Sequence, residues 1–275
     1  MEMSQSFQEH ESRPNELLQT KFALPRLHTS IVPRDSLFST LNKGLEGKLT
    51  LLNAPAGFGK TTLVSTWAAR SIAGVHIAWI SLDENDDDPA RFWRYVLTAS
   101  QQFDEAAGRS SLKQLHLSQE INFEAILTTW INEMSRAPGR NALVLDDYHF
   151  IQSSQIHNQV TFLIDHLPTN LHVVILSRSE PSLPLARLRA QGELLELRST
   201  DLKFSPDEAR LFLQDAVPYA LPSETITYLH ERTDGWAAGL HLVALMLQFK
   251  PDTKVRAQFL AQFSGSVRPI LDYLV

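Results

Sequence analysis

The sequence predicts an α/β fold in which helices sandwich a five-stranded, mostly parallel sheet, followed by a small helical domain. Short apolar runs alternate with helical stretches over about the first 200 residues, which is typical of a parallel sheet. The runs are continuously apolar, as expected for strands that are covered on both faces. Beyond Leu197 the strand-like runs stop and helix-capping patterns follow, which predicts the separate helical domain.

Each predicted element has a local signal. The strands are short apolar runs between turn or helix signals. We predict them at Leu49–Asn53, His76–Ser81, Ala142–Asp146, Leu171–Ser177 and Glu193–Leu197. We predict helices from Gly59 to Arg70, from Pro89 after the N-cap Asp88, from Asn122 to Ser135, from Ser154 to His166, and over Leu185–Gln191. Residues 104–120 are polar and weakly patterned, which favours a loop with at most a short helix.

The helical domain begins with the capping box Ser205-Pro206-Asp207-Glu208, which opens a helix to about Ala216. Further helices are predicted from Ser223 to Asp234-Gly235 and over Ala237–Leu247. We therefore divide the chain into a disordered lead-in (residues 1–18), a sheet domain (19–200), a lid-like helical domain (201–262) and the start of another domain (263–275). Pro269–Val275 begins an apolar helix without a polar stop, so we expect the chain to be part of a longer protein.

Composition excludes several classes of protein. The 275 residues carry 25 basic and 31 acidic side chains, a formal net charge of −6, whereas general nucleic-acid or anionic-membrane binders need a basic surface. The absence of cysteine excludes disulfides, thiolate nucleophiles and Cys-ligated zinc, and it favours a cytoplasmic location. The polar, acidic first stretch is no signal peptide, and no apolar run approaches the ~20 residues of a membrane span.

The strongest motif follows the first strand. Leu49–Leu63 reads LTLLNAPAGFGKTTL, a phosphate-binding P-loop with Ala54 where G-x-x-x-x-G-K-[ST] has its first Gly. Glycines allow positive φ, so the loop N–H groups turn toward a phosphate above the helix N-terminus. Lys60 would reach the β- and γ-phosphates, and the Thr61 hydroxyl is a candidate magnesium ligand. The predicted nucleotide-contacting residues are Ala54, Pro55, Ala56, Gly57, Phe58, Gly59, Lys60, Thr61 and Thr62. The alternative is a Gly-rich turn with a surface lysine, which would not need the flanking strand and helix.

Polar residues end two other predicted strands. Asp146 and Asp147 follow the third strand, at the edge where open α/β sheets bind ligands. Asp146 is predicted to hold magnesium and Asp147 to orient an attacking water. If the sequence had no P-loop, Asp146 and Asp147 would be better interpreted as two solvated residues of a turn. Arg178 follows the fourth strand and either senses the γ-phosphate or forms a surface salt bridge, and both interpretations stay open.

Other features receive structural interpretations. The ten histidines show no metal-ligand spacing, and His149, His157 and His166 are interpreted as solvated or capping residues. The acidic run Asp83–Asp88 is interpreted as a solvated loop that ends in a helix cap. All five tryptophans stand among apolar neighbours and are predicted to lie in the core: Trp67, Trp79, Trp93, Trp130 and Trp236.

Together these motifs resemble the N-terminal ATPase region of the large ATP-binding regulators of the LuxR family, which are signal-transduction (STAND) P-loop ATPases. The resemblance runs from about Thr20 to the end of the chain. Its motifs are Thr20-Lys21-Phe22 with Pro25-Arg26, Ile31-Val32-Pro33-Arg34, Ala54–Thr62, Leu82-Asp83, Asp88–Trp93, Leu145–His149, Leu176-Ser177-Arg178 with Pro181, and Thr233-Asp234-Gly235-Trp236.

The resemblance implies that the chain binds ATP or ADP with Mg²⁺ and that slow hydrolysis resets a switch. It implies that Arg34 helps to hold the nucleotide and that Arg178 acts beside it. An unknown inducer together with ATP would favour self-association, and no membrane would be involved. Residues 263–275 would start a winged-helix-like domain, and DNA would be bound only through a C-terminal domain that this chain does not include. Relatives with a Pro in the Gly-Trp-x-x-Gly-Leu segment use it near the nucleotide base, whereas here Ala237 and Ala238 follow Trp236, so the resemblance does not imply that contact for this chain.

Two other functions remain open at this point. The first is a stand-alone P-loop ATPase or phosphotransferase, which would need an acceptor-binding pocket and a basic lid. The second is a nucleotide-binding fragment without regulatory activity.

Overall fold

The computed structural model describes residues 16–26, 32–70, 74–117 and 120–248. The predicted lead-in up to residue 15, the end of the predicted lid-like domain after residue 248 and the predicted segment 263–275 lie outside these residues. Domain boundaries there remain predictions.

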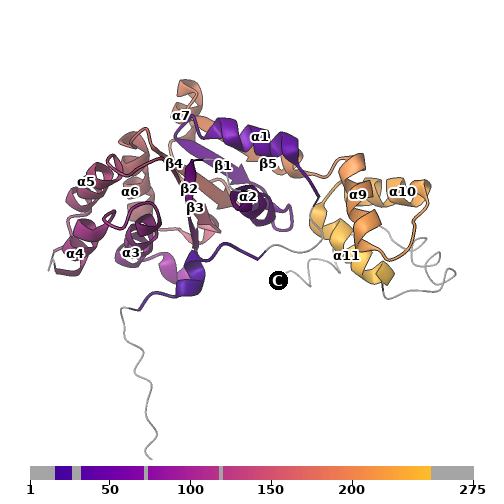
Figure 1. Ribbon diagram of the computed structural model, residues 1–275, viewed down its shortest axis with the longest axis horizontal. Coiled ribbons are helices and arrows are strands. Elements are labelled where there is room, and N and C mark those ends of the chain that lie inside the picture. The colour runs from indigo at the N-terminus through magenta and orange to yellow at the C-terminus, as the bar shows by residue number, and fades with distance from the viewer. Residues whose placement is uncertain (1–15, 27–31, 71–73, 118–119, 249–275) are drawn as a thin grey trace, which may run out of the picture.

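Five strands form a sheet in which every neighbouring pair is parallel, in the order β2-β3-β4-β1-β5 (Figure 1). Each predicted strand is confirmed, with ends that differ by at most two residues. The strands are β1 (Leu49–Asn53), β2 (Val75–Ser81), β3 (Arg140–Asp146), β4 (Leu171–Ser177) and β5 (Leu194–Arg198). Because β4 lies between β1 and β3, the residue after β4 stands between the residues that follow the other two strands.

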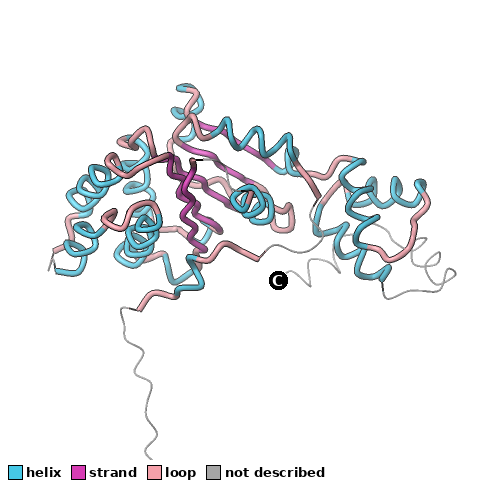
Figure 2. The backbone as a smooth tube through the Cα atoms, viewed as in Figure 1, coloured by secondary structure: helices cyan, strands magenta, loops and turns pink. Residues whose placement is uncertain are grey.

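Helices cover both faces of the sheet, so the strands are apolar on both sides (Figure 2). Along β1, Leu51 packs on the face covered by α3, α5 and α6, and Leu52 packs on the face covered by α1 and α2. The helices of this part are α1 (Asp35–Gly44), α2 (Lys60–Ala69), α3 (Pro89–Ala99), α4 (Arg109–Leu117), α5 (Phe123–Met134), α6 (Ser154–Asp165), α7 (Leu185–Gln191) and α8 (Ser199–Leu202).

The segment 104–120, interpreted as a loop with at most a short helix, contains the helix α4. Only Ser111 and Leu115 are buried in α4, so its apolar signal in the sequence is weak. The helix α1 was not predicted. It begins after Arg34, whose side chain does not cap it, so the usual start signal is missing.

The acidic run is less solvated than predicted. Asp86 is fully buried, and its carboxylate forms ion pairs with the side chains of Lys21 and Arg91 (Arg91 Nε to Oδ1, 3.1 Å). Lys21 also pairs with Asp83 at 2.7 Å, so the short 3₁₀ helix η1 (Gln19–Phe22) is fastened to the sheet beside β2. Asp88 caps α3 as predicted, accepting a hydrogen bond from the Arg91 N–H at 2.8 Å. Glu84 and Asn85 are exposed and Asp88 caps α3, as interpreted, whereas Asp86 is buried.

Four tryptophans lie in the core as predicted: Trp67, Trp79, Trp93 and Trp130 are each at most 2% exposed. The prediction for Trp236 is wrong, because its side chain is only partly buried and contacts the loop after β1. His157 is also not a solvated residue, since it is buried with its Nδ1 3.1 Å from the Tyr148 hydroxyl.

The last three helices form a second, smaller body, here called the helical unit (Figure 1). It consists of α9 (Pro206–Ala216), α10 (Ser223–Thr233) and α11 (Ala237–Gln248). The predicted capping box is present, with Ser205 and Glu208 exchanging hydrogen bonds at the start of α9. The unit has its own apolar core around Phe212, Leu229 and Leu240. Among the described residues, no helix is long and apolar enough to cross a membrane.

Candidate nucleotide site

The loop of residues 54–59, here called the phosphate loop, joins the end of β1 to the start of α2. Gly57 (φ 79°) and Gly59 (φ 75°) adopt the left-handed conformation that the motif predicts. This conformation is the reason for glycine at both positions. The first N–H groups of α2 have no carbonyl partner within the helix, so they and the helix dipole are available to an anion.

Lys60 folds back over the phosphate loop. Its Nζ donates to the carbonyl oxygens of Ala54 (2.6 Å) and Pro55 (3.0 Å). Burial lowers the pKa of Lys60 to about 8, although the carboxylates of Asp147 and Asp146 act in the opposite direction. Lys60 is therefore a buried cation whose charge is not neutralised by a direct ion pair among the described residues, which fits a site for an anionic ligand.

Thr61 and Asp146 meet although 85 residues separate them in the sequence. The Thr61 hydroxyl lies 3.1 Å from each carboxylate oxygen of Asp146. Burial raises the pKa of Asp146 to about 6, with a further contribution from the charge of Asp147. A hydroxyl and a buried carboxylate are hard oxygen ligands of the kind that Mg²⁺ prefers, so the two residues fit a magnesium site.

Asp147 and Arg178 flank this pair. Asp147 adopts the left-handed conformation (φ 56°), and its side chain is 38% exposed. Arg178 is exposed and directly follows Ser177, which pairs with Asn53 at the end of β1, so it stands beside the start of the phosphate loop. Its charge contributes to lowering the pKa of Lys60. Among the described residues Arg178 has no ion-pair partner, so the salt-bridge interpretation finds no support there.

His149, interpreted from the sequence as a solvated or capping residue, lies beside Asp147 instead. Its Nδ1 is 3.6 Å from Asp147 Oδ1, and its side chain is only 14% exposed. Burial lowers the pKa of His149, so its ring is neutral near pH 7. The described residues contain no cluster of three or more His, Asp or Glu side chains that would form an independent metal site.

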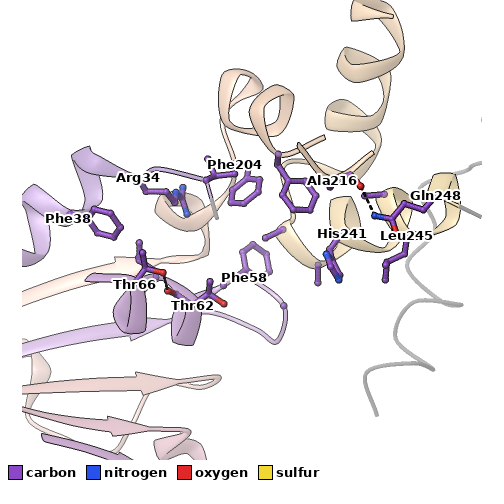
Figure 3. A pocket seen from close by; sticks show the side chains of 18 residues that line it. Arg34, Phe38, Phe58, Thr62, Thr66, Phe204, Ala216, His241, Leu245 and Gln248 are labelled. Carbon is purple, nitrogen blue, oxygen red and sulfur yellow. Dashed lines mark hydrogen bonds between the residues drawn. The ribbon is translucent and has the colours of Figure 1, made fainter. Parts of the chain in front are cut away.

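A pocket of about 630 Å³ opens between the phosphate loop and the helical unit (Figure 3). Aromatic rings line both of its sides: Phe38 and Phe58 from the sheet part, and on the other side Phe204 from the linker before α9 and Phe212 from the helical unit. The remaining lining residues are Val32, Arg34, Gly57, Gly59, Thr62, Leu63, Thr66, Ala216, Ala237, Ala238, His241, Ala244, Leu245 and Gln248. Its size and apolar character are typical of a small-molecule site.

Arg34 lines this pocket, and its guanidinium also forms hydrogen bonds to the helical unit and to the linker before it. It donates to Glu208 (Nε to Oε1, 2.9 Å) and to the carbonyl oxygens of Leu202 and Lys203 (2.9 Å each). Phe204 lies against the guanidinium, 5.3 Å from ring centre to Cζ. The residue predicted to hold nucleotide therefore also joins α1 to the linker before α9.

Of the predicted residues, Arg34, Gly57, Phe58, Gly59 and Thr62 line the pocket, while Lys60, Thr61, Asp146, Asp147 and Arg178 gather at the adjacent strand ends. The backbone carbonyl oxygens of the other three predicted residues accept hydrogen bonds from side chains outside the loop. Lys60 donates to Ala54 and Pro55, and Trp236 donates to Ala56. Sequence reasoning missed Phe38, Phe204, Phe212 and His241. Each stands in an ordinary helical or linker context, and no local pattern marks it.

Comparison of sequences finds close relatives among transcription regulators. The chain is 37% identical over 265 residues to the HTH-type transcriptional regulator MalT of Yersinia pestis (strain Pestoides F), covering 94% of this chain. It is 36% identical over 264 residues to MalT of Serratia proteamaculans (strain 568). The chain spans about 28% of the length of these relatives. No protein-family model matches the sequence.

Comparison of structures finds P-loop ATPase folds. A STAND protein with a tetratricopeptide repeat sensor from Pyrococcus horikoshii aligns over 89% of this chain and 34% of its own, with a TM-score of 0.57 and 14% identity. Cdc6p from Pyrobaculum aerophilum aligns over 86% of this chain and 66% of its own, with a TM-score of 0.51 and 13% identity. At these identities the likeness concerns the fold alone.

Proposed function

The chain is homologous to the MalT transcriptional regulators and has the fold of a P-loop ATPase, and on this premise we propose that it is the ATP- and ADP-binding module of a bacterial transcription regulator. The nucleotide state is the switch, and slow magnesium-dependent hydrolysis of ATP resets it. The ATP-bound form self-associates in response to an inducer, and DNA is bound by another region of the full-length regulator. The lack of cysteine favours action in the cytoplasm.

One observation carries this proposal. The Thr61 hydroxyl and the Asp146 carboxylate are 3.1 Å apart, and Thr61 directly follows the buried Lys60. Gly59 and Thr62, on either side of these two residues in the sequence, line the aromatic pocket. A nucleoside polyphosphate with magnesium presents a planar base, a chain of anionic oxygens and a divalent cation. The site offers a complementary surface for each of these three parts.

Each residue is assigned a role from its position. The phosphate loop and the N-terminus of α2 bind the phosphate chain, and Lys60 extends from the loop carbonyls toward its terminal oxygens. Thr61 and Asp146 hold Mg²⁺, which supplies positive charge that stabilises the transferring phosphoryl group. Asp147 orients the attacking water, and Arg178 stabilises negative charge that develops at the γ-phosphate.

The pocket takes the base between the aromatic rings of its two sides. Its described lining residues include no Asp or Glu, the acceptors suited to the N1–H and amino group of guanine. A carboxylate of the kind that selects guanine is thus missing from the described lining. Thr62 and Thr66 of α2 face this pocket at the end next to the phosphate loop (Figure 3).

Lys60→Ala tests the site. The change removes the cation that faces the phosphates, so ADP and ATP affinity measured by calorimetry should fall by about 10- to 100-fold. Lys113→Ala, which removes an exposed lysine on α4, is the matched control and should leave both affinities unchanged. Equal affinities in the Lys60→Ala variant and the unmodified protein would refute the nucleotide site.

Asp147→Ala tests the hydrolytic step. We expect the single-turnover rate of ATP hydrolysis to fall by about 100-fold while ATP stays bound, because the variant lacks the group that orients the water. An unchanged rate would remove Asp147 from this role. Fast multiple turnover by the unmodified protein would instead favour the stand-alone ATPase over the switch.

A further inference from the structure

We infer that Trp236 of the helical unit is a positioning residue for phosphate binding, because it holds the phosphate loop in its binding shape. The inference rests on the proposed nucleotide site and deepens it. It concerns a residue that the sequence assigned to the core and that lies outside the P-loop motif.

Two hydrogen bonds join the start of α11 to the phosphate loop. The indole Nε1 of Trp236 donates to the carbonyl oxygen of Ala56 at 3.2 Å. Two residues later, the N–H of Ala238 donates to the carbonyl oxygen of Gly57 at 3.0 Å. Lys60 occupies the carbonyls of Ala54 and Pro55, so four successive carbonyl groups of the loop have donors.

The direction of these bonds matters for an anion. Carbonyl oxygens carry partial negative charge and repel phosphate, whereas N–H groups attract it. Fixing the Ala56 and Gly57 carbonyls toward the helical unit leaves the opposite side of the loop to its N–H groups. Trp236 and Ala238 therefore contribute to phosphate binding without contact to the phosphates.

Close packing at Gly57 supports the same arrangement. A Cβ atom at Gly57 would lie 2.6 Å from Ala238 Cβ and 2.8 Å from Trp236 Nε1. Glycine at this position is thus required by the approach of the helical unit as well as by its positive φ. The loop and α11 fit each other without space for an additional methyl group.

The Trp236 segment is itself anchored on the other side. Gly235 (φ 69°) accepts a hydrogen bond from the Phe204 N–H at 2.8 Å, and a Cβ atom on it would lie 2.5 Å from the Phe204 carbonyl oxygen. Arg34 binds the carbonyls of Leu202 and Lys203 just before Phe204. The segment that carries the Trp236 indole is therefore hydrogen-bonded to the linker before α9. A movement of the helical unit would move the indole away from the phosphate loop.

The test compares Trp236→Phe with the unmodified chain, using ADP and adenosine as the two probes. The change removes the N–H donor and keeps an aromatic ring. Adenosine has the base but no phosphates, so its affinity, measured by competition against a fluorescent ADP analogue, reports the pocket alone. We expect ADP affinity to fall by about 2- to 10-fold, the range for one hydrogen bond, and adenosine affinity to stay unchanged.

Trp130→Phe is the matched control. Trp130 is fully buried, its Nε1 has no hydrogen-bond partner, and it packs in the core on the face covered by α5. This variant loses the same atoms as Trp236→Phe without losing a hydrogen bond to the loop, so its ADP affinity should equal that of the unmodified chain. If Trp236→Phe does not fold, Trp236→Leu, which also lacks the N–H donor, takes its place with the same expected result.

The outcomes separate the two proposals. Equal losses for ADP and adenosine would mean that Trp236 supports the base pocket only, and no loss for either would mean that its bond to Ala56 is incidental. Both results overturn the inference and leave the nucleotide site intact. Failure of the unmodified chain to bind ADP would overturn the proposed function together with this inference.

Discussion

Lys60 and Asp146 are both buried, and both pKa values move toward the neutral form for the same reason. A low-dielectric surrounding disfavours charge, so burial lowers the pKa of Lys60 to about 8 and raises that of Asp146 to about 6. Phosphates would restore the charge of Lys60, and a divalent cation would restore that of Asp146. The residues that we propose to bind the ligand therefore carry charges that burial disfavours when no ligand is bound.

His172 shows the same effect away from the site. In β4 it is 3% exposed, with Nδ1 2.8 Å from the Gly47 carbonyl oxygen and Nε2 2.9 Å from the Thr50 hydroxyl. Because a carbonyl only accepts, Nδ1 carries the proton and Nε2 accepts from Thr50. Burial lowers the pKa of His172 to about 4, so the folded protein keeps this ring neutral in mildly acidic solution.

This burial predicts a pH-dependent stability. Between about pH 6.5 and 4 the unfolded chain binds a proton at His172 and the folded chain does not, so stability falls as the pH falls. The loss from this residue should be about 1 kcal/mol between pH 7.5 and 5.5. Urea unfolding at the two pH values should show a smaller difference in His172→Asn than in the unmodified protein. His76→Asn, at an exposed histidine of β2, should keep the full difference, and an unchanged difference in His172→Asn would refute the assignment.

At the scale of elements, the strands and helices with strong local sequence signals were predicted correctly, and helices with weak signals were missed or underestimated. The strands were predictable because apolar runs bounded by turns leave few alternatives. Helix α3 was predictable because Asp88 and Pro89 form a cap that works through neighbouring residues. Helix α1 has no capping side chain and α4 has few buried residues, so tertiary packing decides them.

The cap of α3 gives a prediction at this scale. Asp88→Ala removes the acceptor of the Arg91 N–H and should lower the free energy of unfolding by about 1 kcal/mol. Asp88→Asn keeps a side-chain oxygen and should lose less. The urea midpoint measures both, and equal losses would show that the charge, not the hydrogen bond, is important.

At the scale of the whole molecule, the helical unit is joined to the sheet part around the candidate site. Arg34 and Glu208 form an ion pair at 2.9 Å on one side of the pocket, and Trp236 and Ala238 contact the phosphate loop on the other. Nucleotide bound in the pocket would add contacts to both bodies. Under the proposed function, the position of the helical unit and the occupancy of the site would thus be linked, as a nucleotide switch requires.

Gly57→Ala tests this link. The new methyl group would collide with Ala238, push the helical unit away from the phosphate loop and lower ADP affinity by about 10-fold or more. Gly192→Ala is the matched control, since Gly192 has a similar φ of 70° and open space around it. It should cost about 1 kcal/mol of stability from backbone strain and leave ADP affinity unchanged. Equal ADP affinities in both variants would show that the contact does not influence the site.

The sequence by itself determined the sheet, the phosphate loop and the residues at the strand ends. These features are local: a loop of six residues and a helix start bind phosphate largely through backbone groups, and parallel strands bring their ends to one edge of the sheet. Three features became known only from the tertiary structure: the pocket, the hydrogen bonds of Arg34 to the linker before α9, and the contact of Trp236 with the phosphate loop. Trp236 and Ala56 are 180 residues apart, and a contact between such distant segments depends on how two packed bodies meet, which no local pattern encodes.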